Sequence, residues 1–196
     1  MAPSLQLILA SSSPRRLDLL RQIGIDPDRT LSPEVDETPR RGELPRQHAA
    51  RLAGDKARTV AERLGREVGF VVAADTVVAC GRRILPKTEM VAEAEACLAL
   101  LSGRRHRVFG GVCVVAPGGR MAARTVTTVV EFKRLSEREI ESYLASGEWR
   151  GKAGGYAIQG RAAGLIPSIN GSYSNVVGLP LAETLGLLHG LGWRGA

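Results

Sequence analysis

The stretch Leu5-Gln-Leu-Ile-Leu-Ala-Ser-Ser-Ser-Pro-Arg-Arg16 contains the first two structural elements of the chain. Its apolar part predicts a buried strand that ends at Ala10, because the run is short and three serines follow it. Ser13 is a suitable N-cap for a helix that begins at Pro14, a residue that the first helical position tolerates. Gly24 marks the end of this helix. A strand that leads directly into a helix favours an α/β fold.

Strands and helices continue to alternate along the rest of the chain. Periodic apolar residues predict helices at 45–64, 91–101, 136–146 and 180–191. Short apolar runs predict strands at 70–74 and 165–169, and hairpins at 77–85 and 107–132. Residues 26–45 are polar and rich in proline, and they predict a long loop. Because hairpins interrupt the alternation, we expect a mixed sheet flanked by helices.

Composition restricts the class of protein. The 196 residues are 44% hydrophobic and 24% charged, as in a globular chain, and without repeat or linker they predict a single domain over 1–196. An aromatic content of 4% argues against a nucleic-acid module built on base stacking. No apolar run approaches the ~20 residues of a membrane span, and the signal-peptide pattern is missing, so we expect no membrane partner. Three widely spaced cysteines favour reduced thiols and a cytoplasmic location.

The net charge of +7 leaves several interpretations open. A basic surface can bind nucleic acid, a basic cleft can attract a small polyanion such as a triphosphate, and an arginine-rich surface can simply be solvated. The lysines are more informative, because compact ammonium groups are scarce in this chain. There are four of them: Lys56, Lys87, Lys133 and Lys152.

The serine turn before the first helix predicts an anion site. Free backbone N–H groups and the positive end of the helix dipole favour phosphate there, and Arg15 and Arg16 add charge that can bind two oxygens at once. The alternative is an ordinary helix cap followed by solvated arginines. The turn is not a Walker A loop, because the glycine-rich stretch and its Gly-Lys-Ser/Thr ending are missing.

Asp75 is the strongest single indication of chemistry. It follows Phe70-Val-Val-Ala-Ala74 and precedes Val77-Val-Ala79, where a carboxylate is costly to bury unless it is paired or binds a metal. We expect it at a strand end, where α/β folds place catalytic acids, although a structural aspartate is the alternative. An acidic group in the loop, such as Glu37, could join it to hold Mg²⁺, or the loop could be solvated.

Three further polar residues interrupt apolar surroundings. Lys56 falls within the apolar stripe of its helix, so that it either snorkels to solvent or reaches into a cleft. Lys87 follows the first hairpin. Gln159 stands among apolar and glycine residues, where its amide either satisfies backbone groups or contacts a ligand. Since neither a nucleophile elbow nor a metal-spaced histidine cluster is present in the sequence, attack by a metal-assisted water is the better chemical fit.

Taken together, seven segments in order resemble the Maf family of nucleotide pyrophosphatases over nearly the whole chain. They are Leu9-Ala-Ser-Ser-Ser-Pro-Arg-Arg16, Val35-Asp-Glu-Thr-Pro39, Arg51-Leu-Ala-Gly-Asp-Lys-Ala57, Ala74-Asp-Thr-Val-Val78, Leu101-Ser-Gly-Arg104, Lys152-Ala-Gly-Gly-Tyr-Ala-Ile-Gln-Gly160 and Ile169-Asn-Gly-Ser-Tyr-Ser-Asn-Val-Val-Gly-Leu-Pro180. The resemblance implies cleavage of a nucleoside triphosphate between the α and β phosphates, with Mg²⁺ or Mn²⁺. It also implies an elongated α/β fold like that of the inosine-triphosphate pyrophosphatases, with two lobes around a cleft, and a homodimer.

The resemblance also assigns roles to residues of this chain. It implies catalytic roles for Asp75, Lys87 and Arg15, and a metal site formed by Glu37 and Asp75. The implied substrate contacts are Ser11, Arg16, Lys56, Thr76 and Gln159.

Within the family, the Tyr156-Ala-Ile-Gln-Gly160 segment and Thr76 are similar to the branch that acts on dTTP and UTP, where Gln159 would pair with the pyrimidine edge. The alternatives are the 7-methyl-GTP branch, a broad purine pyrophosphatase, and a non-catalytic nucleic-acid-binding or division-regulating protein. The family usually has Lys-Pro after the first hairpin, whereas Thr88 follows Lys87 here.

Overall fold

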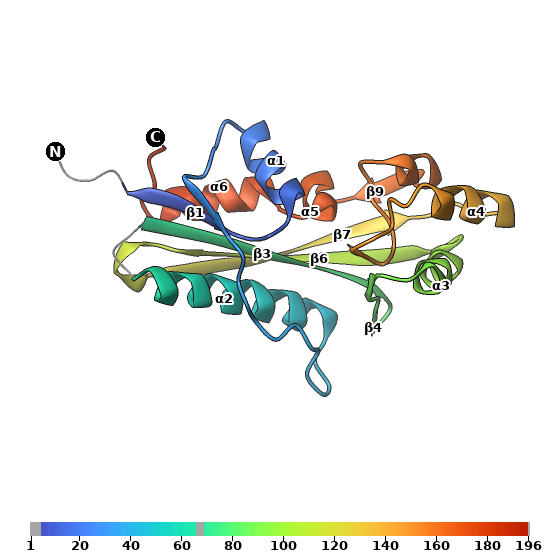
Figure 1. The fold of residues 1–196 in the computed structure, drawn as a ribbon, viewed down its shortest axis with the longest axis horizontal. Coiled ribbons are helices and arrows are strands. Elements are labelled where there is room, and N and C mark those ends of the chain that lie inside the picture. The colour runs from blue at the N-terminus through green and yellow to red at the C-terminus, as the bar shows by residue number, and fades with distance from the viewer. Residues whose placement is uncertain (1–4, 66–68, 196) are drawn as a thin grey trace.

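The computed structural model describes residues 5–65 and 69–195, and its main feature is one long sheet (Figure 1). From one edge to the other, the strands are β2 (Arg29–Leu31), β1 (Gln6–Ala10), β3 (Gly69–Cys80), β6 (Arg105–Val115), β7 (Met121–Glu131) and β9 (Ser168–Asn170), and β4 (Arg83–Ile84) pairs with β3. β1 is parallel to β2 and β3, whereas the other pairs are antiparallel. The predicted mixed α/β sheet is confirmed.

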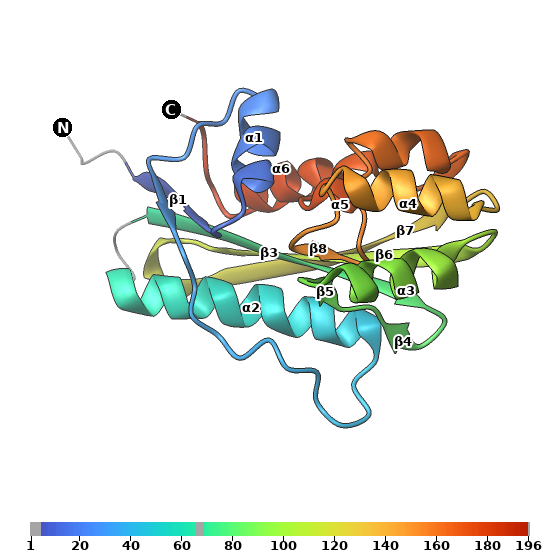
Figure 2. The ribbon, with the colours of Figure 1, turned by 45° about the vertical axis from the view of Figure 1, so that its right-hand side comes forward.

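Helices lie on both faces of this sheet (Figures 1 and 2). They are α1 (Pro14–Gln22), α2 (Pro45–Leu64), α3 (Val91–Leu101), α4 (Glu137–Ala145), α5 (Tyr173–Val177) and α6 (Leu181–Gly190). α2 covers one face, and α1, α5 and α6 lie on the other. Small residues let α2 approach closely, since a Cβ at Gly111 of β6 would lie 2.2 Å from the carbonyl oxygen of Ala49. This close approach brings the inward face of α2 directly against β3.

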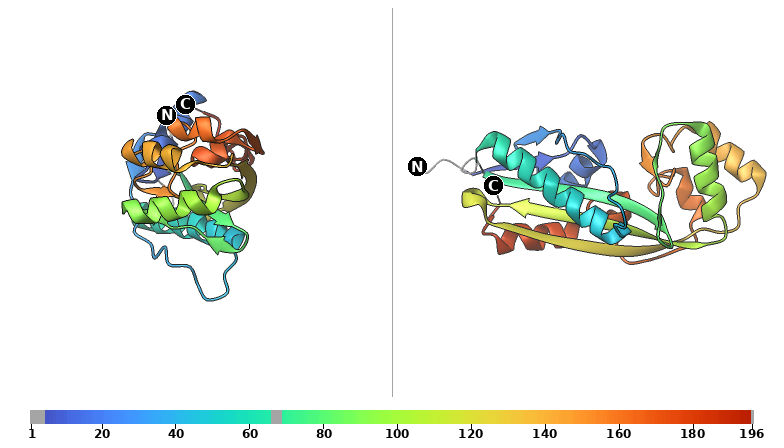
Figure 3. Two further views of the ribbon diagram at one scale, coloured as in Figure 1. Left: turned by 90° about the vertical axis from the view of Figure 1, so that its right-hand side faces the viewer. Right: turned by 90° about the horizontal axis from the view of Figure 1, so that it is seen from below.

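The molecule is elongated and has two lobes, as Figure 3 shows most clearly from below. One lobe contains β1, β2, α1, α2 and α6. The other contains α3, α4 and a small antiparallel pair, β5 (Lys87–Thr88) with β8 (Lys152–Ala153). β3 and β6 contribute to the cores of both lobes, because Val72 and Val112 belong to one core and Val78 and Val108 to the other. The predicted elongated shape is thus present.

Most predicted elements occur within a few residues of their predicted bounds, but two need correction. β3 is one uninterrupted strand, so Asp75 lies within it and not at its end. The reason is that β6 pairs with β3 along this whole region, with Gly111 opposite Asp75. The strand predicted at 165–169 is present but shifted, because Leu165 ends a 3₁₀ helix, Arg161–Leu165, and the strand β9 begins only at Ser168.

Four short elements were not predicted. β2 lies inside the predicted loop at 26–45, α5 follows β9, and β5 and β8 pair with each other. All four are too short to show a period in the sequence. Within the described parts of the chain, none of the helices has both the length and the apolar character needed to cross a membrane.

Candidate active site

A cleft between the two lobes collects the predicted site residues. One wall is the turn at 11–16 from the first lobe, and β3 forms the floor through Thr76 and Val78. The opposite wall comes from β5, β8 and residues 156–159 of the second lobe, and residues 176–178 close one side. The two-lobed arrangement with a cleft is therefore as predicted, and its lining comes from segments far apart in the sequence.

The serine turn is shaped by one buried hydroxyl. Ser11 Oγ accepts hydrogen bonds from the backbone N–H of Ser13 (3.1 Å) and from Arg16 Nη1 (3.1 Å). Ser13 occupies the predicted N-cap position, but its hydroxyl makes no capping hydrogen bond, and the residue lines the cleft. The turn thus offers a helix N-terminus and a hydroxyl to an anion.

Arg16 joins the turn to two other segments. Its Nε donates to the carbonyl oxygen of Gly178 (2.9 Å), and its Nη2 donates to Thr76 Oγ1 (3.4 Å). Burial lowers the pKa of Arg16, and the negative charges of Asp75 and Glu37 oppose this effect. The hydrogen-bond acceptors of Arg16 are neutral, so they do not compensate the positive charge of the guanidinium. This charge can therefore act on an anion in the cleft.

Arg15 lies in the same wall with fewer partners. Its Nε is buried and has no hydrogen-bond partner among the described residues. Burial, and then repulsion by Arg16, lower the pKa of Arg15. A buried donor without a protein partner is costly, and a water or a ligand in the cleft can supply the acceptor.

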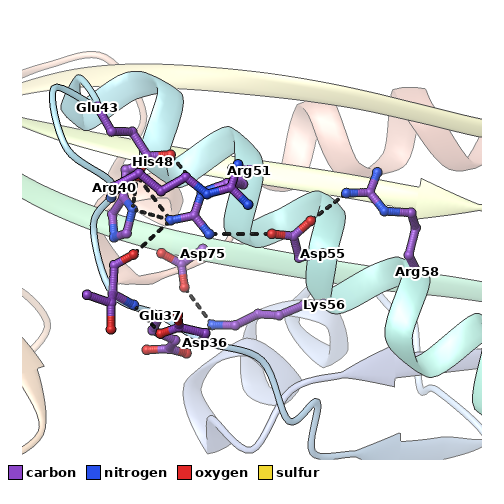
Figure 4. A network of polar contacts seen from close by, with 11 residues as sticks. Asp36, Glu37, Arg40, Glu43, His48, Arg51, Asp55, Lys56, Arg58 and Asp75 are labelled. Atoms are coloured by element: carbon purple, nitrogen blue, oxygen red, sulfur yellow. Dashed lines mark hydrogen bonds and ion pairs between the residues drawn. The ribbon is translucent and has the colours of Figure 1, made fainter.

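A chain of ion pairs lines the same pocket as these arginines, and Figure 4 shows the part of it around Lys56. Lys56 Nζ lies 2.6 Å from Asp75 Oδ1 and 2.5 Å from Glu37 Oε1, and Glu37 Oε2 lies 2.5 Å from Lys87 Nζ. Lys56 and Asp75 are 5% and 3% exposed, so Lys56 reaches inward and does not snorkel to solvent. Burial alone would raise the pKa of Glu37, but hydrogen bonds from both lysines lower it to about 2. The predicted acidic loop residue is therefore part of the cluster.

Asp75 can be buried within a strand because Lys56 compensates its charge. β1 ends at Ala10, opposite Ala73, so β3 loses its parallel neighbour just before Asp75. The end of the neighbouring strand, and not the end of its own strand, leaves room beside Asp75, which lines the pocket that adjoins the cleft. Its Oδ2 has no protein hydrogen-bond partner among the described residues.

Gln159 and Thr76 lie in the same cleft as the arginines. Gln159 is exposed, at the end of a wall that Tyr156, Ala157 and Ile158 form. The wall is apolar apart from its backbone groups and the Gln159 amide, as a nucleobase site requires. All nine predicted site residues thus line the cleft or the adjoining pocket around Asp75.

Sequence reasoning left two groups out of the site. Lys152 lines the cleft, and burial and then repulsion by Arg15 lower its pKa. The scarcity of lysines could have identified it. The carbonyl oxygen of Gly178, which holds Arg16, carries no side-chain signature and could not have been found.

The carboxylates fit a divalent cation that is shared with a substrate. Glu37 and Asp75 both contact the Lys56 amine (Figure 4). In the described residues, no group of three or more His, Cys, Asp or Glu could hold a metal alone. Mg²⁺ commonly takes one or two carboxylates and completes its oxygen shell with water and phosphate. The two carboxylates match that donor set, and in this structure each shares one oxygen with Lys56.

The sequence matches a family model described as Maf-like protein over residues 6–191. The chain belongs to the Maf family. A dTTP/UTP pyrophosphatase of Caulobacter vibrioides is 60% identical over 194 residues, which are 99% of this Maf chain and 100% of that protein. A dTTP/UTP pyrophosphatase of Paramagnetospirillum magneticum is 65% identical over 188 residues, or 95% and 97% of the two chains.

Among solved structures, the Maf chain is similar to a nucleoside-triphosphatase, or dITP/XTP pyrophosphatase, from Mycobacterium abscessus. The TM-score is 0.43 at 19% identity, and the likeness covers 67% of this chain and 74% of the other. The family membership rests on the sequence matches. The resemblance inferred from the seven segments is confirmed by them.

Proposed function

We propose that this Maf chain hydrolyses dTTP and UTP to the nucleoside monophosphate and pyrophosphate. The full-length relatives named for this activity support the proposal. The observation that carries it is the Glu37–Lys56–Asp75 cluster, which places a carboxylate between cations opposite Arg15 and Arg16. A triphosphate that lies along the cleft would have positive side chains on both sides. One of its phosphates would lie near Asp75.

The cations would bind the phosphates by complementary means. Arg15 and Arg16 present planar guanidinium groups that can each bind two phosphate oxygens. Lys87 and Lys152 reach the cleft from the adjacent strands β5 and β8 and act as compact charges. These groups would hold the triphosphate and stabilise the charge that the leaving pyrophosphate acquires.

Asp75 would accept the proton of the attacking water. Lys56 fixes one oxygen of Asp75, which leaves Oδ2 free to face a water in line with the α-phosphorus. Mg²⁺ or Mn²⁺, held by Glu37 and Asp75, would neutralise charge on the phosphate oxygens. Glu37 would then turn part of its carboxylate away from Lys56 or Lys87.

The base would lie against residues 156–159. The Gln159 amide offers both a donor and an acceptor, as the edge of uracil or thymine does. Tyr156, Ile158 and Val176 narrow the cleft around it. A pyrimidine fits this description better than a purine with its second ring.

A nucleotide panel tests the proposal. The chain is incubated with Mg²⁺ and each of dTTP, UTP, CTP, ATP, GTP and 7-methyl-GTP, and pyrophosphate and orthophosphate are measured separately. We expect pyrophosphate from dTTP and UTP and little from the others. Preferential cleavage of 7-methyl-GTP or of a purine nucleotide would replace the substrate assignment. No turnover at all, together with salt-dependent DNA binding, would favour the nucleic-acid alternative.

Asp75→Asn tests the chemical role. The amide keeps the shape but cannot take a proton, so we expect kcat for dTTP to fall by about 10²–10⁴-fold. Asp18→Asn on the exposed side of α1 is the matched control and should keep the activity. Unchanged pyrophosphate release from the Asp75 variant would exclude the residue as the base.

A further inference from the structure

The segment that carries Glu37 has no regular structure to hold it. Residues 32–44 connect β2 to α2 without a helix or strand. The Glu37 side chain is 40% exposed, and its two lysine partners come from different elements. The Glu37–Lys87 pair joins two exposed side chains and contributes little to fixing a loop. The Glu37–Lys56 pair is better shielded on the lysine side, but it holds only the end of the Glu37 side chain and not the loop backbone. The backbone around Glu37 therefore needs other contacts.

Arg51 of α2 supplies those contacts (Figure 4). Its Nε donates to Glu43 Oε1 (2.7 Å), and its Nη2 donates to Glu43 Oε2 (3.0 Å). The same Nη2 donates to the carbonyl oxygen of Thr38 (3.1 Å). His48 Nδ1 also contacts Glu43 Oε2, at 3.0 Å. One guanidinium thus binds the loop at two points, which are Thr38 and Glu43.

Both partners in these contacts are shielded from water, whereas the Glu37 side chain is 40% exposed. The side chains of Arg51, Glu43 and His48 are 14%, 8% and 6% exposed. Hydrogen bonds from Arg51 lower the pKa of Glu43 to about 2, and hydrogen bonding to Glu43 raises the pKa of Arg51. A two-point arginine–carboxylate pair of this kind is among the stronger polar contacts in proteins.

The geometry connects this pair to the cleft. Thr38 follows Glu37 directly, so a hydrogen bond to its carbonyl, in the Thr38–Pro39 peptide, restrains the backbone one residue after Glu37. Lys56, the partner of Glu37, lies on the same helix as Arg51. α2 therefore holds both the backbone of the loop and the ammonium group that Glu37 must reach.

We propose that Arg51 is a positioning residue, which holds loop 32–44 against α2 so that Glu37 reaches between Lys56 and Lys87. The kinetic part of this inference rests on the proposed function. Lysine cannot replace this arginine, because a single ammonium group cannot bind both oxygens of Glu43 and the Thr38 carbonyl with the same geometry.

Kinetics with dTTP test whether Arg51 acts through Glu37. Arg51→Met should lower kcat by about 10- to 100-fold, as displacement of a site residue by about 1 Å can do. Arg51→Lys should also lose activity. Arg58→Met is the matched control, since Arg58 is on the same helix, is 49% exposed and contacts Asp55 and not the loop. In a Glu37→Gln background, the additional substitution Arg51→Met should lower kcat only slightly further. An equal loss in both backgrounds, or no loss in either, would overturn the proposal.

Hydrogen exchange tests the loop independently of catalysis. The amides of Thr38 and Arg40 donate to Asp36 Oδ1 and Glu43 Oε2 in the structure. In Arg51→Met, peptides covering 32–44 should exchange faster, while those of α2 beyond Lys56 and those of Arg58→Met should not. Equal exchange in the wild type and Arg51→Met contradicts the proposal. If dTTP is not hydrolysed but the loop loosens, the proposed function fails and the role of Arg51 in holding the loop stands.

Discussion

Arg15 and Arg16 follow each other in the sequence but differ in their surroundings. Arg16 is bound to Ser11, Thr76 and Gly178. Arg15 keeps a buried Nε without a partner among the described residues. Arg16 therefore maintains the shape of the cleft as well as its charge, whereas Arg15 is free to bind what enters it.

Arg15→Met should separate binding from stability. We expect KM for dTTP to rise about tenfold or more, because a hydrogen bond to a charged group contributes about 1.5–3 kcal/mol. The melting temperature should not fall, since the variant removes a buried donor that lacks a partner. Kinetics and thermal unfolding of this variant and of Arg21→Met, an exposed position on the same helix, provide the comparison. A lower melting temperature with unchanged KM would show that Arg15 serves the fold instead.

At the scale of single residues, the sequence predicts which side chains belong to the site better than it predicts which groups those side chains contact. The position of Lys56 within an apolar stripe and of Asp75 within an apolar run follow from local pattern, and the structure brings the two together. The contact of Arg16 with Gly178 spans 162 positions and involves a backbone carbonyl, which leaves no trace in the local sequence. The Arg51–Glu43–Thr38 contacts were missed for a related reason, since the loop has no period that relates it to α2.

At the scale of elements, β5 and β8 fix the positions of two lysines. Thr88 is fully buried, and its hydroxyl donates to the carbonyl oxygens of Trp149 (2.8 Å) and Lys152 (3.4 Å). The backbone N–H of Gly151 donates to the carbonyl oxygen of Thr88 (2.9 Å). Thr88 thus ties the strand of Lys87 to the strand of Lys152.

Thr88→Val should weaken this connection. The variant keeps the shape and removes the hydroxyl, so we expect a loss of about 1–3 kcal/mol in the free energy of unfolding. Thr88→Ser keeps the hydroxyl and should lose less. Chemical denaturation of the three proteins measures the difference. If Thr88→Val and Thr88→Ser lower the free energy of unfolding equally, the hydroxyl hydrogen bonds do not account for the loss.

The bounds of β3 show what local pattern cannot predict. The apolar run broken by Asp75 resembles a strand end, but pairing with β6 continues through it. A strand ends where its partner ends, and the partner lies more than 30 positions further along the chain. The bounds of the helices and of the long hairpin depend on local sequence pattern, and they were therefore predicted closely.

At the scale of the whole molecule, the net charge of the chain and the excess charge of the residues around the cleft are both positive. The chain carries a net charge of +7, and Arg15, Arg16, Lys56, Lys87 and Lys152 surround two carboxylates in the site. Such a field raises the rate at which a polyanion meets the cleft. A homodimer stays a prediction that light scattering can measure.

Salt should therefore reduce capture of the substrate. Between about 0.01 M and about 0.1 M ionic strength the Debye length falls from about 30 Å to about 10 Å, so we expect kcat/KM for dTTP to fall several-fold. kcat at saturating dTTP should change little. A kcat/KM that is independent of salt would mean that the charge outside the cleft contributes nothing to association.

The strands that run through both lobes have a further consequence for selectivity. Domains that close on a ligand usually rotate about a few loop residues, but here hydrogen-bonded β3 and β6 connect the two walls of the cleft. Changing the distance between the walls would require a different twist of the sheet along these strands. We therefore expect a cleft of nearly constant width. Such a cleft selects bases by size when the nucleotide binds, before any bond is broken.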